Sequence, residues 1–243
     1  MVTAVLISGG LDSAVLLAEE AADGHVQPIY VSVGLAWERA EHAVLGKLLG
    51  AEPLGVATGR VRPLVSLTVD MRDVYPAGHW AIEGHAPGYR TPDEDVYLPG
   101  RNVILLGKAG VYCAASHIDR LVLGTLAHNP FPDATPAFRS AMAQALSLGL
   151  AHPLTIDAPY RAVGKADVIR RGVALGVPLQ LTLSCMKPVQ NPGTDLRVRH
   201  GDPSPTIVHC GTCSKCRERH DAFLEAGVVD PTEYANRGYV GTV

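Results

Sequence analysis

The sequence predicts a Rossmann-like α/β fold, in which helices cover both faces of a parallel sheet, followed by a small cysteine-rich segment. Two observations predict the sheet: short apolar runs alternate with helical patterns, and a Gly-rich turn joins the first apolar run to the first helical pattern. The third observation is that four of the five cysteines lie in the last quarter of the 243 residues. We therefore expect an α/β domain over residues 1–182 and the appended segment over residues 183–243.

The expected strands are short runs rich in apolar and β-branched residues. They lie at residues 4–7, 26–33, 65–71 and 118–124, with a further extended stretch at 152–156. The expected helices follow the 3.6-residue period and cover residues 14–20, 36–49, 102–116, 136–148, 163–175 and 214–226. In the second of these helices the apolar stripe consists of Ala36, Ala40, Ala43, Val44 and Leu48.

Two proline-rich stretches interrupt this alternation. Residues 72–100 carry four prolines, and residues 128–133 read His-Asn-Pro-Phe-Pro-Asp. Long irregular loops are uncommon in compact domains and are often functional. Both stretches follow expected strands, and a doubly wound sheet binds ligands at the carboxyl ends of its strands. We therefore expect both loops at the same sheet edge as the turn at Gly9 and Gly10.

The composition argues against several classes of protein. The net charge of −3 provides no overall attraction to nucleic acids or to anionic membranes. No stretch approaches the roughly 18 consecutive apolar residues of a membrane span. The first residues lack the basic region and the cleavage site of a signal peptide. We expect a cytoplasmic protein with neither a nucleic acid nor a membrane as its partner.

The first Gly-rich turn has the features of a phosphate-binding site. An apolar strand leads into six residues that open a helix: Ser8, Gly9, Gly10, Leu11, Asp12 and Ser13. The glycines let a ligand approach closely, and the free N–H groups and the helix dipole attract an anion. The run resembles the SGGxDS pyrophosphate loop (PP-loop) of the ATP pyrophosphatases, which split ATP into AMP and pyrophosphate to activate a substrate oxygen. This resemblance implies an adenine nucleotide alpha hydrolase-like fold.

Four cysteines form a candidate metal site: Cys185, Cys210, Cys213 and Cys216. Four thiolates at short spacing suit a tetrahedral structural zinc site, while an iron–sulfur cluster or no metal are the alternatives. We expect Zn²⁺ in a structural role, with His209 on the surface or beside the site rather than as a ligand. The cations that follow, Lys215, Arg217 and Arg219, form either a solvated face or a positive environment for the thiolates.

The turn and the cysteines together resemble the 7-cyano-7-deazaguanine synthase family. Further landmarks lie between them in the family's order, at residues 98–102 (Leu-Pro-Gly-Arg-Asn), 131–133 (Phe-Pro-Asp) and 164–165 (Gly-Lys). The resemblance spans nearly the whole chain. The chain departs from the family at residues 128–135, which keep Asp133 but lack the family's upstream Asp and its Tyr, Cys and Arg, and the interval from Cys185 to Cys210 is longer than in the family.

The resemblance implies an ATP-dependent ligase that acts on 7-carboxy-7-deazaguanine. The substrate carboxylate attacks the α-phosphate of ATP, and ammonia then displaces AMP to give an amide. A second ATP activates the amide oxygen, and loss of AMP leaves the nitrile. The resemblance also implies ATP, Mg²⁺ and Zn²⁺ as bound groups, and a homodimer.

The resemblance further assigns roles to single residues. The residues expected to bind ATP are Ser8, Gly9, Gly10, Leu11, Asp12, Ser13, Arg101 and Asn102, and Asp12 is the expected Mg²⁺ contact. The expected catalytic residues are Asp12, Ser13, Arg101 and Lys165, and the expected substrate-binding residues are His128, Asn129, Phe131 and Asp133. Asp133 has an alternative role as the cap of the helix that follows Pro136.

Three alternative functions stay open. One is a related PP-loop enzyme that adenylates another carboxylate or stops at the amide. Another is a tRNA-modifying PP-loop enzyme, against which the net charge of −3 and the length of 243 residues argue. The last is a non-catalytic nucleotide-binding module, against which the intact turn argues.

Overall fold

Five parallel strands form the central sheet of the computed structural model, which describes residues 2–127, 129–191 and 206–239. The strands are β1 (Val2–Leu6), β2 (His25–Ser32), β3 (Val65–Thr68), β4 (Arg120–Val122) and β5 (Thr155–Asp157). Their order is β3-β2-β1-β4-β5, and Val5 pairs with Pro28 on one side and with Val122 on the other. The chain reverses its direction of winding between β1 and β4, the place where such a sheet binds ligands. The predicted parallel α/β fold is confirmed.

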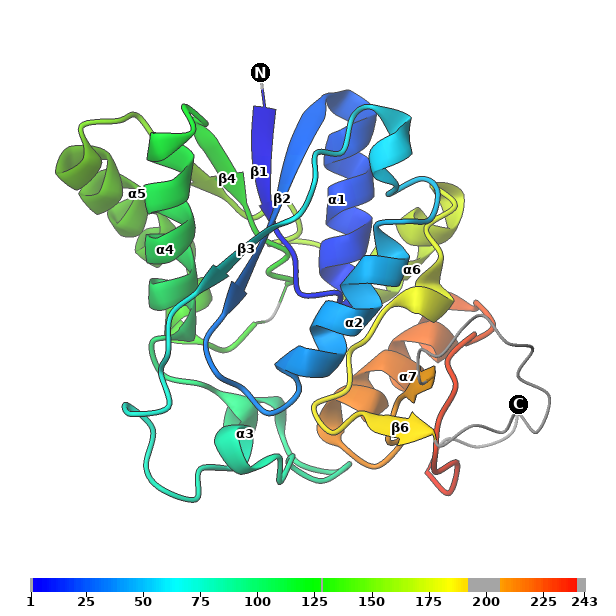
Figure 1. The fold of residues 1–243 in the computed structure, drawn as a ribbon. Helices are drawn as coiled ribbons and strands as arrows, with labels where there is room; N and C mark the ends of the chain where they lie inside the picture. Colours follow the sequence, from blue (N-terminus) through cyan, green and yellow to red (C-terminus); the bar gives the residue numbers. More distant parts are fainter. Residues whose placement is uncertain (1, 128, 192–205, 240–243) are drawn as a thin grey trace, which may run out of the picture.

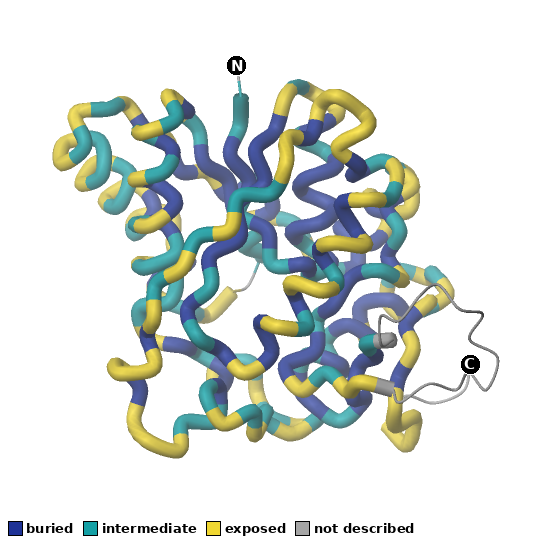
Figure 2. The backbone as a smooth tube through the Cα atoms, in the orientation of Figure 1, coloured by how far each residue is buried: buried dark blue, intermediate teal, exposed yellow. Residues whose placement is uncertain are grey.

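Helices cover both faces of this sheet (Figure 1). One face carries α4 (Arg101–Ala115) and α5 (Pro136–Leu150), and the other carries α1 (Leu11–Asp23), α2 (Glu38–Leu48) and α6 (Lys165–Ala174). Because strand side chains alternate between faces, Ala4 packs in the core shared with α4 while its neighbour Val5 packs in the core shared with α1. The central strands β2 and β4 are consequently largely buried, whereas the edge strand β3 alternates half-buried and exposed residues (Figure 2).

The connections hold short helical elements. Residues 72–100 contain α3 (Trp80–Glu83) and a 3-10 turn, η2 (Asp93–Val96). The other 3-10 turns are η1 (Val56–Thr58), η3 (Pro132–Ala134) and η4 (Leu179–Leu181). Residues 72–100 and η3 both approach the edge of the sheet where the strands end, as their positions in the chain predict.

Thr135, rather than Asp133, caps α5. The Thr135 Oγ1 atom accepts a hydrogen bond from Phe138 N at 3.2 Å, and Pro136 occupies the first helical position. Such a hydroxyl satisfies one of the N–H groups that a helix start leaves free, and proline has no N–H to satisfy there. The alternative role proposed for Asp133, as the cap of this helix, is therefore wrong.

The buried side of α2 differs from the apolar stripe of its sequence. Its buried residues are Glu38, Glu41, Leu45 and Leu48, whereas Ala36 and Ala43 are exposed and Ala40 and Val44 are half-buried. Two of the buried residues are acidic because they reach polar partners: Glu38 accepts from Val33 N at 2.8 Å, and Glu41 accepts from Tyr30 OH at 2.8 Å. Apolar periodicity alone cannot reveal a face that is buried through hydrogen-bonded carboxylates.

The C-terminal part packs on the sheet domain through α7 (Ser214–Ala226), whose bounds match the predicted helix. Phe223 of α7 is fully buried in the core shared with α1 and α6. An antiparallel pair, β6 (Val189–Asn191) and β7 (Thr206–Val208), was not predicted. The division at residue 182 stays a prediction. Among the described residues, no helix combines the length and the apolar character that crossing a membrane requires.

Candidate active site

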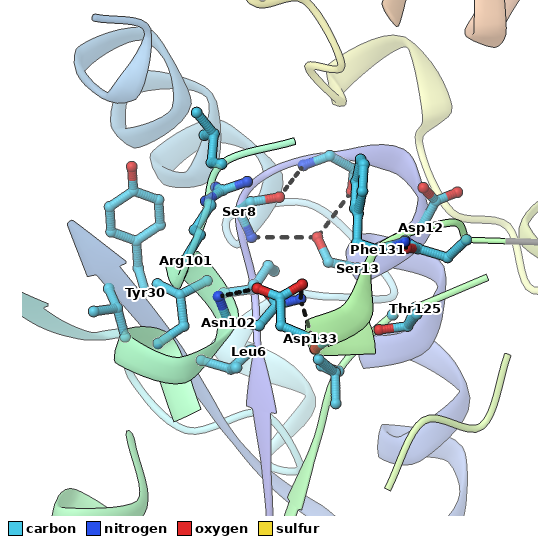
Figure 3. Close-up of a pocket in the computed structure, with 18 of the residues that line it drawn as sticks. Leu6, Ser8, Asp12, Ser13, Tyr30, Arg101, Asn102, Thr125, Phe131 and Asp133 are labelled. Carbon is cyan, nitrogen blue, oxygen red and sulfur yellow. Dashed lines mark hydrogen bonds between the residues drawn. The ribbon is translucent and has the colours of Figure 1, made fainter. Parts of the chain in front are cut away.

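A cavity of about 280 Å³ opens where β1, β2 and β4 end, at the reversal point of the sheet (Figure 3). Residues 8–13, here named the phosphate turn, form one side of it. The first turn of α4 and the irregular loops form the rest, so that five separate segments supply the lining: Ser8, Asp12 and Ser13; Tyr30; Glu41; Tyr97, Arg101 and Asn102; Thr125, Asn129, Phe131 and Asp133. The expectation that the turn and both loops share one sheet edge holds.

The phosphate turn is held by hydrogen bonds within itself. Ser13 Oγ donates to Gly10 O at 3.0 Å and accepts from Ser8 N at 3.3 Å, while Ser8 Oγ accepts from Gly10 N at 3.3 Å. Gly9 has a φ of +80°, and a Cβ there would lie 3.4 Å from atoms of α2. The first N–H groups of α1 have no acceptor inside the helix, so they are free to bind an anion. The Leu11 side chain is buried in the core, which leaves only its backbone to take part.

Asp12 joins the phosphate turn to an ion-pair network. Its Oδ2 lies 3.1 Å from Lys165 Nζ, which also donates to Glu218 Oε1 at 2.7 Å, and Glu218 Oε2 accepts from Lys215 at 2.6 Å. Burial disfavours the charged amine, but the two carboxylates outweigh burial and raise the pKa of Lys165. Burial likewise opposes the ionised form of Glu218, but Lys165 and Lys215 lower its pKa to about 2.

Mg²⁺ fits this corner of the site. Asp12 Oδ1 is buried and has no hydrogen-bond partner among the described residues. A buried polar oxygen normally has a partner. Carboxylate oxygens are the ligands that Mg²⁺ takes, usually together with substrate phosphates. Asp12 is therefore the residue through which this chain would hold the ion.

Arg101 and Glu41 both line the cavity and interact electrostatically. Burial raises the pKa of Glu41 to about 7, although the charge of Arg101 and the hydrogen bond from Tyr30 oppose this shift. Burial and the Glu41 carboxylate raise the pKa of Tyr30, so its hydroxyl stays a donor. Arg101 Nε is buried without a hydrogen-bond partner in the described part of the chain. A free guanidinium donor at a cavity suits an anion such as a phosphate.

Asp133 and Asn102 bind each other at the start of α4. The Asp133 carboxylate accepts from Asn102 N at 3.1 Å and from Asn102 Nδ2 at 3.3 Å. Nearby, the ring of Phe131 stacks on that of Tyr97, with centroids 5.1 Å apart and an interplanar angle of 25°, and Asn129 Oδ1 accepts from Phe131 N at 3.0 Å. The stacked pair is an apolar, planar wall of the kind that packs against a flat heteroaromatic ligand.

The four cysteines converge into a candidate metal centre. Their Sγ atoms lie within 4.8 Å of one another, with separations of 3.5 Å for Cys213–Cys216, 3.8 Å for Cys210–Cys216 and 3.9 Å for Cys185–Cys213. Four sulfurs at about 2.3 Å from one tetrahedral ion lie about 3.8 Å apart. The cluster could therefore bind one Zn²⁺, whereas an iron–sulfur cluster would need room for several irons and sulfides between the thiolates. Backbone N–H groups of Lys187 and Cys210 donate to Cys185 Sγ and so orient this sulfur within the cluster.

Two polar residues near the cysteines, His209 and Arg219, are buried rather than solvated. His209 is 5% exposed and its Nε2 accepts from Ser184 N, so it lies beside the cluster and not on the surface. Arg219 is 0% exposed and donates to a carbonyl and to hydroxyls within residues 179–184. Arg217 donates to two carbonyls of the 72–100 loop. The alternative of a solvated face is therefore wrong for Arg219, whereas Arg217 is half-buried.

A protein-family model described as queuosine biosynthesis protein QueC matches residues 2–227. This chain belongs to the QueC family. A relative named 7-cyano-7-deazaguanine synthase from Methanopyrus kandleri is 33% identical over 248 residues, covering 96% of this chain and 98% of the relative. A relative of the same name from Azoarcus sp. is 33% identical over 246 residues, covering 96% of each. A third, from Anaeromyxobacter dehalogenans, is 30% identical over 239 residues, covering 95% of this chain and 94% of the relative.

The family resemblance that the ordered motifs predicted is thus confirmed for this QueC-family chain. The structure brings most of the predicted ATP-binding and substrate-binding residues to one cavity, and it places Lys165 beside Asp12. His128 lies outside the described residues. The roles of these residues stay predictions.

Sequence reasoning did not find four residues at the site: Tyr30, Glu41, Tyr97 and Glu218. Tyr30 lies in a predicted strand and Glu41 in a predicted helix. The available signal for Glu41 was its helical spacing from Leu45 and Leu48, which places all three residues on one face of α2. Tyr97 stood directly before the Leu-Pro-Gly-Arg-Asn landmark. Glu218 had no signal in the sequence, because only folding brings α7 to Lys165.

Proposed function

We propose that this chain is an ATP-dependent carbon–nitrogen ligase that converts 7-carboxy-7-deazaguanine and ammonia into 7-cyano-7-deazaguanine. Membership of the QueC family over residues 2–227 carries the proposal, because relatives of nearly the same length bear the name of this activity. The cavity adds support, since it combines a turn suited to an anion with an aromatic pair suited to a flat ring system. The reaction consumes two ATP molecules and releases two AMP and two pyrophosphate.

The two activations are the same chemistry applied to two oxygens. The substrate carboxylate displaces pyrophosphate from the α-phosphate of ATP, and ammonia then displaces AMP and loses a proton to leave an amide. The amide oxygen displaces pyrophosphate from a second ATP, and the carbon–oxygen bond breaks as the nitrogen loses its protons, leaving a nitrile and AMP. Each oxygen thus leaves the substrate carbon as part of AMP, which is a far better leaving group than oxide.

The phosphate turn would stabilise the charge that develops on pyrophosphate. Its free N–H groups and the positive end of α1 are fixed before the reaction, which is what electrostatic stabilisation requires. Lys165 and Arg101 would add cationic donors at the phosphates. Mg²⁺ held through Asp12 would neutralise phosphate charge, and Zn²⁺ in the cysteine cluster would hold the C-terminal segment in place.

The acceptor would bind on the other side of the cavity. Tyr97 and Phe131 would pack against its fused rings, and Asn129 and Asp133 would contact its polar edge. A homodimer is inferred from the resemblance. We place the reaction in the cytoplasm, since five free cysteines suit a reducing compartment.

Incubation of the purified protein with ATP, Mg²⁺, ammonium chloride and 7-carboxy-7-deazaguanine tests the proposal. Mass spectrometry of the products should show the nitrile, together with two AMP for each nitrile formed. Accumulation of the amide with one AMP would contradict nitrile formation and would support the alternative of an amide-forming relative. The altered residues 128–135, where Asp133 binds Asn102, are the observation that favours this alternative. No AMP in the presence of this acceptor would contradict the substrate assignment.

A further inference from the structure

Three successive residues of α7 reach three different segments around the active site. Arg217 donates to the carbonyls of Tyr89 and Thr91, both at 3.0 Å, in the loop that continues into the cavity lining. Glu218 binds Lys165. Arg219 donates to Leu179 O at 2.8 Å. Four residues further along the chain, the backbone N–H of Leu183 donates to Gly9 O at 2.8 Å. The start of α7, which carries Cys216 of the cysteine cluster, therefore braces both sides of the site.

Glu218 is the member of this set that acts on a charged group at the phosphate turn. Its carboxylate and that of Asp12 share the Lys165 ammonium, and the three side chains are 24%, 25% and 13% exposed, respectively. Lys165 is the first residue of α6, where the positive end of the helix dipole disfavours a cation. The ammonium therefore depends on its two carboxylate partners. Lys215 holds the second Glu218 oxygen at 2.6 Å and so fixes the orientation of this carboxylate.

ATP would compete for one of these two partners. Phosphates that enter the phosphate turn are anionic, as is Asp12, and both attract the same ammonium. Lys165 carries three N–H donors, so it can turn one of them from Asp12 toward a phosphate while another stays on Glu218. Glu218, which is attached to α7 and does not line the cavity, would keep the amine within reach of the phosphates throughout.

We propose that Glu218 is a positioning residue of the ATP site, which holds the Lys165 ammonium while that ammonium passes from Asp12 to the phosphates of ATP. This rests on the proposed function only in assigning ATP to the cavity. The proposal does not depend on which acceptor the enzyme adenylates. It also gives the cysteine cluster a consequence at the active site, because the cluster anchors the helix that carries Glu218.

The test is the affinity for ATP, measured by isothermal titration calorimetry without any acceptor. We expect Glu218→Gln to weaken ATP binding about tenfold, in line with the loss of a charge-assisted hydrogen bond. Glu225→Gln, an exposed position on the same helix, is the matched control and should bind ATP as the unchanged chain does. Zinc content and the thermal midpoint should be unaltered in both variants.

A double-mutant cycle separates positioning from mere structural support. In a Lys165→Met background, Glu218→Gln should cause no further loss of ATP affinity, because the group on which it acts is gone. An equal loss in both backgrounds, or unchanged ATP binding in Glu218→Gln, would overturn the proposal. If Glu218→Gln lowers the thermal midpoint, Lys215→Met takes its place in the cycle. Lys215→Met should weaken ATP binding a few-fold, and this loss should also vanish in the Lys165→Met background. Failure to form the nitrile leaves these binding results intact, so the two proposals fail separately.

Discussion

The two sides of the cavity are built in different ways. The phosphate turn is one continuous stretch of six residues in which the Ser8 and Ser13 hydroxyls hydrogen-bond to the backbone of the turn itself. The opposite wall combines Tyr30 and Glu41 with Tyr97, Arg101 and Phe131, which lie far apart in the sequence. The first side depends on local backbone geometry and the second on packing. A change in the turn should therefore abolish one step of the chemistry, whereas changes in the wall should alter recognition or stability by smaller amounts.

The largest effect is expected at the phosphate turn. Asp12→Asn removes the charge that faces Lys165 and the expected metal contact, so AMP release should fall at least about 100-fold. Asp23→Asn, at the exposed far end of the same helix, is the control and should leave the rate unchanged. Quantification of AMP under saturating ATP measures the effect. A rate for Asp12→Asn within a few-fold of the unchanged chain would remove Asp12 from the catalytic set.

The cysteine cluster is a mixed case, since three of its four ligands are close in sequence and the fourth is remote. Cys213→Ser should release the metal and lower the free energy of unfolding by about 3 kcal/mol or more. Cys113→Ser changes a buried cysteine outside the cluster and should keep the metal. Metal analysis by mass spectrometry, combined with urea unfolding, checks both variants. Full zinc content in Cys213→Ser would show that this thiolate is not a ligand.

Glu41 provides a pH test of the assembled wall. Burial raises its pKa from 4.5 to about 7 in the folded chain. The charge of Arg101 and the hydrogen bond from Tyr30 oppose this shift, and the charge of Glu38 adds to it. Between these pH values the folded chain binds more protons than the unfolded chain, so this carboxyl makes the free energy of unfolding fall as pH rises from 4.5 to 7. Glu41→Gln removes that contribution. Above pH 7 its free energy of unfolding should therefore exceed that of the unchanged chain by up to about 3 kcal/mol.

Urea unfolding at a series of pH values measures this gain. Glu52→Gln, at an exposed position, is the control and should follow the pH dependence of the unchanged chain. The same slope in Glu41→Gln as in the unchanged chain would mean that Glu41 is ionised throughout this range.

The smallest effect is expected at the stacked pair. Tyr97→Ala removes one ring of the pair and should raise the KM for the acceptor about tenfold, with ATP affinity unchanged. Tyr97→Phe keeps the ring and should behave as the unchanged chain does. Steady-state kinetics with each substrate varied in turn provides the measurement. If Tyr97→Ala instead weakened ATP binding and left the KM for the acceptor unchanged, the stacked pair would belong to the ATP site and not to the acceptor site.

Local signals in the sequence were sufficient for the phosphate turn, the cysteine spacing and the alternation of strands and helices. A Gly-Gly turn between a strand and a helix determines where the free N–H groups lie, because those groups belong to neighbouring residues. Cys210, Cys213 and Cys216 likewise lie within one turn and the start of one helix. Such features depend on interactions a few residues apart, which the order of residues specifies directly.

The tertiary structure alone decided which residues complete the site. It turned Glu38 and Glu41 of α2 inward in place of the alanines, assigned Asp133 to α4 rather than to α5, and brought Glu218 to Lys165 across 53 residues. Each of these carboxylates has a hydrogen-bonding partner in another element or loop, from Val33 for Glu38 to Lys165 for Glu218, so that the cost of burying it is offset. A carboxylate on a predicted helix has the same local sequence signal whether it faces water or a buried cation, so its role is settled only when the chain folds.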